Sequence, residues 1–259
     1  MLESSTATAN SSGLTPSHLS SPILYYVNDK DLIEQARQHL FNNYFFDLCT
    51  AEQQEQLMKS IKISRYHHGQ TIFRQGIACN ELTLILKGTI KMSWNIDNGK
   101  CITHRFLPTG FLINIVPLMS KRPLVHDHIA HDATIIATVS GEIFLSILQN
   151  NPKFSYNVFE MICKRNHILF EETYHRASQP LRIRLAREFM ILVDFFSKQE
   201  AEGIKITIKL SQEHFAELLQ TSRQSINKEL LWLSQEGIAE AKYNQITILD
   251  LKKLKALLH

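Results

Sequence analysis

The chain has few of the features that mark secreted, membrane or metal-binding proteins. Its four cysteines, at 49, 79, 101 and 163, form no C-x-x-C pair, and their spacing fits no zinc or iron–sulfur motif. No run approaches the roughly 18 apolar residues of a membrane span, and the N-terminus lacks the basic and apolar regions of a secretion signal. We therefore expect a reduced, cytoplasmic protein with no membrane partner, no metal and no other cofactor.

The chain also lacks a strong charge of either sign. Its net charge is +3 over 259 residues, and residues 181–259 hold about as many acidic as basic side chains. Any binding of nucleic acid must therefore come from the placement of charges, because their sum is too small to indicate it. A hydrophobic fraction of 44% and a charged fraction of 20% are typical of globular proteins, and the length accommodates two domains.

The N-terminal segment is short of large apolar side chains. Residues 2–22 are rich in Ser, Thr, Ala and Asn, and such a segment cannot bury enough surface to offset its ordering entropy. We expect a flexible tail over residues 1–28. Helices are predicted to follow at about 31–40 and 52–60.

Short β-prone runs separated by turn residues occupy residues 61–147. Many short strands at this spacing predict a sandwich or a barrel. The hydrophilic segment 97–100, Asp-Asn-Gly-Lys, resembles the tip of a hairpin. The expected strands include 61–64, 70–73, 82–86, 89–92 and 133–139.

A long helix is predicted next, over residues 152–176, which contain no Pro or Gly after Pro152. Proline suits a first helical turn, and Pro180 ends the helix. One stripe along it begins apolar and becomes polar, so we expect its first half to pack on the β region and its second half to meet a partner helix. The stripe consists of Val158, Ile162, Arg165, Leu169, Glu172 and Arg176. A second helix is expected at 181–193, then a polar loop at 198–203 and a strand at 204–208.

Residues 210–233 are the most informative segment. Ser211 is a good N-cap for a short helix that buries Phe215, Leu218 and Leu219, and the following break, Gln220-Thr221-Ser222, offers Thr or Ser as the next cap. In the second helix Ile226, Leu230 and Leu233 stand at i, i+4 and i+7 and are expected to face inward. Two strands at 238–242 and 245–249, turning at 243–244, and a helix at 250–258 complete the pattern.

The opposite face of the second helix carries the chemistry that a DNA major groove requires. Arg223 suits guanine, and Gln224 and Asn227 suit adenine. Serine hydroxyls and Lys228 suit phosphate oxygens. This order of elements predicts a winged helix-turn-helix that binds duplex DNA, against the alternative of an ordinary helical hairpin with a solvated polar face. The candidate DNA contacts are Ser211, Gln212, Ser222, Arg223, Gln224, Ser225, Asn227 and Lys228.

These residues resemble the Crp/Fnr family of bacterial transcription regulators. The match at 222–238, Ser-Arg-Gln-Ser-Ile-Asn-Lys-Glu-Leu-x-x-Leu-x-x-x-Gly-Ile, is similar to that family's recognition helix and wing. Residues 66–76 and 82–91 are similar to the opening strands and glycine turns of its cyclic-nucleotide-binding β-roll. The resemblance spans about 61–250. It implies an α+β fold with an N-terminal double-stranded β-helix (jelly-roll) sensor domain at 29–150, a dimerisation helix at 151–178 and a winged helix-turn-helix at 179–259.

The resemblance also implies a homodimer, joined through 152–177, on a two-fold symmetric DNA site. An activator would in addition contact RNA polymerase. The family's recognition helix often begins Arg-Glu, whereas Gln224 stands in place of the acid here. Because glutamate accepts from cytosine and glutamine favours adenine, the half-site sequence is left open. Gln220 stands where the turn often has glycine, which suggests a slightly different turn.

The cyclic-nucleotide cassette of that family is incomplete in this chain. The family places a Gly-Glu pair after the third glycine turn and an Arg-Ser or Arg-Thr pair later, whereas here Phe111–Met119 follows Gly110 and Val125-His126-Asp127-His128 occupies the second position. Arg122 is the nearest guanidinium but lies in an expected loop. A phosphate without its arginine would be poorly paired, so we expect no tight binding of cyclic AMP or cyclic GMP, and either a different effector or none.

Other sensor chemistries remain as alternatives. His126 and His128 would face the same side of a strand, with His131 close by, so a metal- or haem-responsive sensor and a metal-dependent β-barrel enzyme both have to be weighed. No third ligand is fixed by the spacing, and we expect no enzyme and no metal site. An iron–sulfur sensor is not expected, because no cysteine precedes Cys49. Aromatic residues such as Phe106 and Phe111 are expected in the β-domain core.

Overall fold

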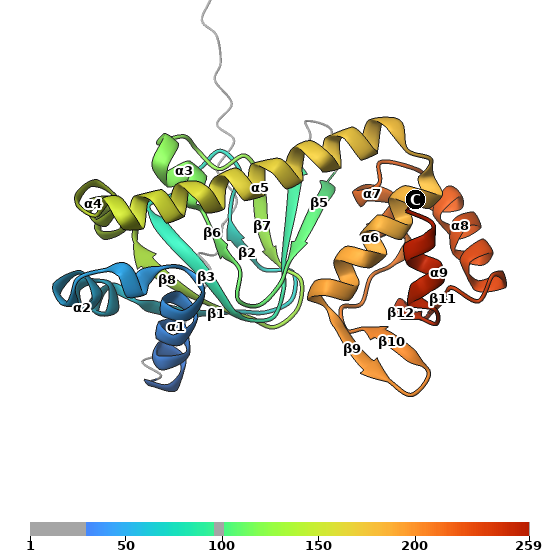
Figure 1. Cartoon of the computed structure of the whole chain (residues 1–259), viewed down its shortest axis with the longest axis horizontal. Helices are drawn as coiled ribbons and strands as arrows, with labels where there is room; N and C mark the ends of the chain where they lie inside the picture. Colours follow the sequence, from blue (N-terminus) through green and yellow to red (C-terminus); the bar gives the residue numbers. More distant parts are fainter. Residues whose placement is uncertain (1–29, 96–100, 259) are drawn as a thin grey trace, which may run out of the picture.

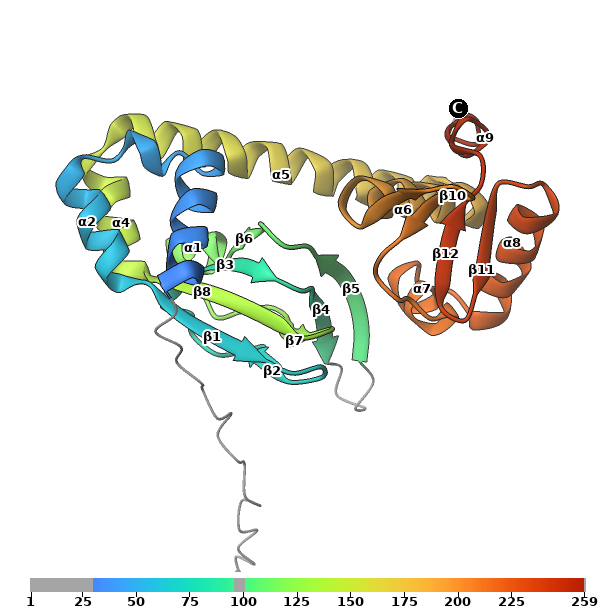
Figure 2. The ribbon, with the colours of Figure 1, turned by 90° about the horizontal axis from the view of Figure 1, so that it is seen from below.

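The computed structural model describes residues 30–95 and 101–258. A β domain and a C-terminal helical domain lie side by side, and the long helix α5 (Pro152–Ser178) runs from one to the other (Figures 1 and 2). The expected tail at 1–28 and the expected hairpin tip at 97–100 lie outside the described residues.

Two four-stranded antiparallel sheets make up the β domain, as the jelly-roll prediction required. Their strand orders are β1-β8-β3-β6 and β2-β7-β4-β5. Each strand run expected from the sequence forms a strand, with ends that differ by at most three residues. The strands are β1 Lys62–Tyr66, β2 Thr71–Phe73, β3 Glu81–Lys87, β4 Ile90–Asn95, β5 Cys101–Leu107, β6 Leu112–Ile113, β7 Asp127–Ala130 and β8 Thr134–Ser140.

The first sheet is covered on both faces, and its central strand β3 shows why. Successive side chains of a strand point to opposite faces. Leu82, Leu84 and Leu86 point to a core shared with the helices, whereas Ile85 points to the core between the two sheets. Apolar residues therefore run through β3 almost without interruption. The covering elements are α1 Lys30–Asn43, the short 3-10 helix Phe46–Leu48, α2 Ala51–Ser60, α3 Ile115–Ser120, α4 Gly141–Asn150 and the start of α5.

Helix α5 is attached to the β domain along more of its length than its sequence predicted. Arg165 donates from Nη1 to the carbonyl oxygen of Leu112 at 2.8 Å, and its guanidinium lies 4.8 Å from the ring centre of Phe111. Further along the helix, Glu172 forms an ion pair with Arg105 of β5. Glu172 lies in the half of the stripe that was expected to meet a partner helix, and it contacts a partly buried strand arginine of its own chain. The contact of this half with a partner helix stays a prediction.

The C-terminal domain follows the predicted order of elements, with one correction. Residues 198–203 were expected to be a loop, but half of them belong to strand β9, which pairs with β10 from Gly203↔Glu200 to Ile206↔Ser197. All four side chains of β9 are exposed, so no apolar alternation marks the strand. The elements are α6 Leu181–Phe195, β9 Ser197–Glu200, β10 Gly203–Ile206, α7 Gln212–Leu218, α8 Arg223–Gln235, β11 Ala239–Lys242, β12 Gln245–Ile248 and α9 Leu251–Ala256.

Strand β5 and helix α7 join the two domains directly. Phe106 of β5 is buried in the core of the C-terminal domain, not in the β-domain core where we expected it. Its ring centre lies 4.8 Å from that of His131 and 5.6 Å from that of His214 in α7. The backbone N–H of Thr103 donates to Glu217 of α7 at 3.0 Å, and the Thr103 hydroxyl donates to the same carboxylate. Helix α7 is thus held by both polar and aromatic contacts.

The histidines of this joint make its stability depend on pH. Burial lowers the pKa of both His131 and His214 below the ordinary value near 6.5, and neighbouring His68 and Lys91 lower both further. Asp132 and Glu217 act in the opposite direction. Because the folded state favours the neutral rings, their contribution is complete above pH 6.5 and is lost as the pH falls below it.

We expect the melting temperature to fall between pH 7.5 and pH 5.5, and to fall less in His131→Gln than in the unsubstituted protein. The glutamine keeps a donor for the carbonyl oxygen of Lys209, which His131 Nε2 contacts at 3.1 Å, but has no proton to take up. Circular dichroism at the two pH values measures the difference, with the exposed His67→Gln as the control. Equal pH dependence in all three proteins would show that the joint does not sense protons.

Candidate nucleic-acid interface

Helix α7 begins as predicted, at a serine cap. The Ser211 hydroxyl accepts the backbone N–H of His214 at 3.2 Å, and Nδ1 of His214 accepts the backbone N–H of Ser211 at the same distance. This reciprocal pair satisfies two backbone donors that a helix N-terminus leaves free. The side chain of Phe215 and the small Ala216 are buried beneath α8, so that the two helices cross closely.

The turn between α7 and α8 is a left-handed one despite its glutamine. Gln220 has φ of 49°, the N–H of Thr221 donates to the carbonyl of Ala216 at 2.9 Å, and the N–H of Gln220 donates to that of Glu217 at 3.1 Å. These two bonds are the Schellman pattern that usually has glycine at this position. The expectation of a different turn is therefore wrong, because Gln220 adopts the backbone that glycine would adopt. Ser222 then caps α8 by accepting from the N–H of Ser225 at 3.1 Å.

Helix α8 divides into the two faces that the sequence predicted. Ile226, Leu230 and Leu233 are buried in the C-terminal core. The opposite face is exposed and consists of Arg223, Gln224, Asn227 and Lys228, with Ser222 beside them and Ser225 partly buried.

The acid of α8 is turned away from this exposed face. Glu229 accepts from Nε of Arg182 at 2.7 Å, and the same guanidinium lies 3.7 Å from the ring centre of Trp232. Arg182 belongs to α6, on the inner side of α8. The exposed face of α8 therefore presents hydrogen-bond donors and amides without a carboxylate of its own helix.

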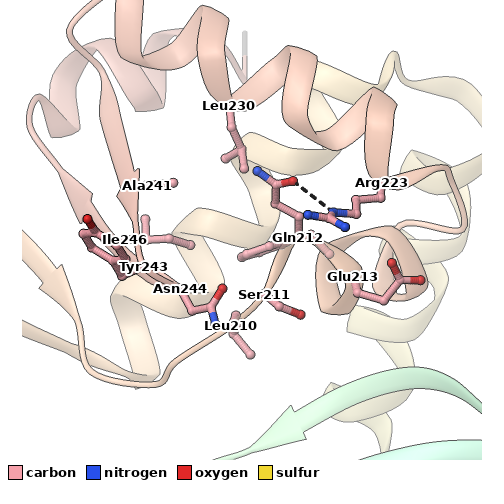
Figure 3. Close-up of a pocket in the computed structure, with 11 residues that line it drawn as sticks. Leu210, Ser211, Gln212, Glu213, Arg223, Leu230, Ala241, Tyr243, Asn244 and Ile246 are labelled. Atoms are coloured by element: carbon pink, nitrogen blue, oxygen red, sulfur yellow. Dashed lines mark hydrogen bonds between the residues drawn. The ribbon is translucent and has the colours of Figure 1, made fainter.

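The first residue of α7 connects the two helices at this face. Gln212 accepts from Nε of Arg223 through Oε1 at 3.4 Å, and its Nε2 donates to Oδ1 of Asn227 at 3.0 Å. Figure 3 shows Gln212 and Arg223 side by side, joined by the dashed line. The sequence predicted Gln212 as a DNA contact but did not predict its bonds to Arg223 and Asn227, because these depend on how the helices cross.

The wing lies next to this face and encloses a groove of about 410 Å³. The two strands β11 and β12 turn at Tyr243 and Asn244, which both have positive φ, 49° and 64°. Such a two-residue turn matches the twist of a hairpin. The side chain of Tyr243 is fully exposed. Figure 3 shows the groove between Tyr243 and Asn244 on one side and Gln212 and Arg223 on the other.

Two parts of the chain match known domain families. Residues 63–151 match the cyclic nucleotide-binding domain, and residues 183–257 match the Crp-like helix-turn-helix domain. This chain belongs to the Crp/Fnr family of transcription regulators. The global nitrogen regulator of Synechococcus elongatus is 22% identical over 195 residues, covering 73% of this chain and 86% of that protein.

Two further Crp/Fnr proteins extend the comparison. The CRP-like cAMP-activated global transcriptional regulator of Mycobacterium tuberculosis is 19% identical over 198 residues, covering 76% of this chain and 88% of that protein. The structure of a CRP-family regulator from Thermus thermophilus has a TM-score of 0.63 at 20% identity, covering 75% of this chain and 96% of that one. The α+β prediction, with a jelly-roll domain, a long helix and a winged helix-turn-helix, is confirmed.

The three histidines whose spacing left a metal site as an alternative, His126, His128 and His131, lie in different surroundings. His126 stacks with His104 and Trp94, at ring distances of 5.1 and 4.9 Å. His128 packs against Phe73, and burial lowers its pKa to about 4. His131 belongs to the domain joint. Among residues 30–95 and 101–258, no group of three His, Cys, Asp or Glu side chains is arranged to hold a metal.

The same described residues contain no helix with the length and apolarity that crossing a membrane requires. In the region where a Crp/Fnr cassette would hold its phosphate, Arg122 is exposed on the loop after α3. Arg165 points to this β region from α5, but its guanidinium is already bound to the Leu112 carbonyl.

We expect Gln220→Gly to raise the free energy of unfolding by about 0.5–1 kcal/mol, because a side chain in the left-handed region is strained and glycine is not. Chemical denaturation followed by circular dichroism measures the gain. The matched control is Gln235→Gly, at the right-handed end of α8, which we expect to destabilise. A loss of stability in Gln220→Gly would contradict the strain.

Proposed function

We propose that this protein is a homodimeric, sequence-specific DNA-binding regulator, and that each copy inserts α8 into the major groove of one half-site. The observation that carries the proposal is the exposed face of α8, whose Arg223, Gln224 and Asn227 bear base-reading groups while its apolar face is buried. A major groove admits one helix, and residues near its N-terminus enter first. Arginine and amide side chains there read base edges.

The remaining candidate residues suit the DNA backbone. Ser211, Ser222 and Ser225 lie at the N-terminal ends of α7 and α8, where hydroxyls and helix dipoles favour phosphate. Lys228 lies beside them on the exposed face and supplies a positive charge. Tyr243 at the tip of the wing is fully exposed next to the same groove, which suits a contact with the sugar-phosphate backbone beyond α8.

A second copy of the chain is the proposed partner of α5. On the side away from the β domain, this helix exposes four aromatic rings, each between 61% and 68% accessible: Tyr156, Phe159, Phe170 and Tyr174. Their successive spacings of three, eleven and four residues are close to whole numbers of helical turns, which places the rings along one side of the helix. Monomeric proteins rarely leave such a row in water, and a two-fold axis beside α5 would bury it against its own copy. This face differs from the stripe first expected.

The β domain is proposed to sense something other than cyclic AMP or cyclic GMP, or nothing. The Gly-Glu and Arg-Ser pairs are missing, Arg122 is exposed, and Arg165 already bonds to the Leu112 carbonyl and lies over the ring of Phe111. The alternative is a sensor with a non-standard pocket. The observation that supports it is the similarity to a cAMP-activated regulator. Titration calorimetry with cyclic AMP separates the two. No catalytic activity is proposed, and an activator would also contact RNA polymerase.

Selection of bound sequences from random DNA tests the function. We expect a two-fold symmetric site, and we expect Arg223→Ala to weaken specific binding by about 1–3 kcal/mol and to relax one base pair per half-site. Lys228→Ala should weaken binding to all sequences and lower the salt slope by about one per copy. If Arg223→Ala weakened binding to every DNA equally, the residue would contact phosphate and the base-reading role would be wrong.

We expect Phe159→Glu with Phe170→Glu to convert the dimer to a monomer, because two carboxylates per copy would be buried in the apolar interface. Light scattering measures the mass, and gel shift measures the accompanying loss of affinity for the symmetric site. Val125→Glu, at an exposed apolar position in the β domain, is the matched control and should leave the mass unchanged. A dimer that survives the double substitution would place the interface elsewhere.

A further inference from the structure

We propose that Gln212 sets the base preference of the DNA-reading face by fixing which way the amide of Asn227 points. The inference rests on the proposed function, because it concerns how α8 reads DNA. Gln212 is the first residue of α7, and it contacts two residues one turn apart on α8: Arg223 and Asn227. It is a positioning residue, since its effect passes through these two side chains.

The direction of the two hydrogen bonds follows from the chemistry of arginine. A guanidinium can donate but cannot accept. The contact with Arg223 Nε therefore requires the carbonyl oxygen of Gln212 on that side, which places the Gln212 amide nitrogen towards Asn227. An amide nitrogen only donates, so Asn227 must offer its oxygen. The charged donor of Arg223 thus fixes the orientation of two amide groups, that of Gln212 and that of Asn227.

The orientation of these two amides determines which hydrogen-bonding groups remain for DNA. Arg223 has its Nε occupied and its two terminal nitrogens free, which is the fork that pairs with O6 and N7 of guanine. Asn227 has its oxygen occupied and its Nδ2 free. A two-bond contact between asparagine and adenine needs that oxygen to accept from N6. An amide oxygen has two lone pairs, but this one is turned towards Gln212 on α7, and the other arm of the amide, Nδ2, is left to meet the base. A donor there suits guanine O6 or N7 or thymine O4.

The first prediction from this geometry is a base preference. At the position read by Asn227, defined as the one whose preference disappears in Asn227→Ala, the unsubstituted protein should favour guanine or thymine over adenine by roughly fivefold or more. The measurement is selection from random DNA, followed by competition binding with sites that differ at that one position.

Gln212→Glu is the decisive variant, because it should reverse the orientation of the Asn227 amide. A carboxylate accepts from Arg223 and also from Asn227 Nδ2, so the asparagine oxygen turns outwards and the preference should move to adenine or cytosine, whose exocyclic amines donate. Gln212→Ala removes the constraint and should reduce the preference at both the Asn227 and Arg223 positions. A glutamate in the first turn suits the helix dipole, so α7 is expected to form in both variants.

The controls separate this inference from the function on which it rests. Gln235→Ala, at the far end of α8, should keep the base preferences of the unsubstituted protein, and melting curves establish that every variant folds. If the unsubstituted protein selects no sequence, the proposed function fails. If it selects a site and Gln212→Glu selects the same bases with only lower affinity, Gln212 contacts phosphate and the positioning role is overturned.

Discussion

The attachment of α7 to strand β5 is the contact on which the arrangement of the molecule depends. Phe106 from the β domain is buried in the C-terminal core, and Thr103 donates twice to Glu217. The other side of α7 is packed on α8, and its first residue holds two of the exposed side chains of that helix. A single seven-residue helix therefore lies between the β domain and the exposed side chains of α8, so that a displacement of β5 would reach α8 through one rigid element.

Helix α5 adds a second connection with a different character. One side is bound to the β domain by Arg165 and Glu172, and the other leaves a row of aromatic rings in solvent. The exposed row of aromatic rings on α5 and the exposed face of α8 belong to different helices. Substitutions on the solvent side of α5 are therefore expected to leave the exposed face of α8 intact.

Much of the fold was predictable because periodicity determines burial. Ile226, Leu230 and Leu233 determine the inner face of α8 on their own, and with it the outer face that carries Arg223. The contacts made by the partly polar stripe of α5 were not predictable. Residue spacing cannot tell whether Glu172 meets an arginine of its own chain or another helix. Strand β9 lacked an apolar alternation, and the bond from Gln212 to Asn227 joins residues fifteen apart through a helix crossing.

The exposed strand β9 affects how the protein behaves at high concentration. It forms the outer edge of the C-terminal sheet, where unpaired backbone groups can recruit a strand from another molecule. The Ser, Lys, Gln and Glu side chains of β9 would lose bound water if another strand paired with it. Glu200 already forms an ion pair with Lys205 at 3.5 Å. The open edge of the sheet thereby stays hydrated, which disfavours the joining of neighbouring molecules into one continuous sheet.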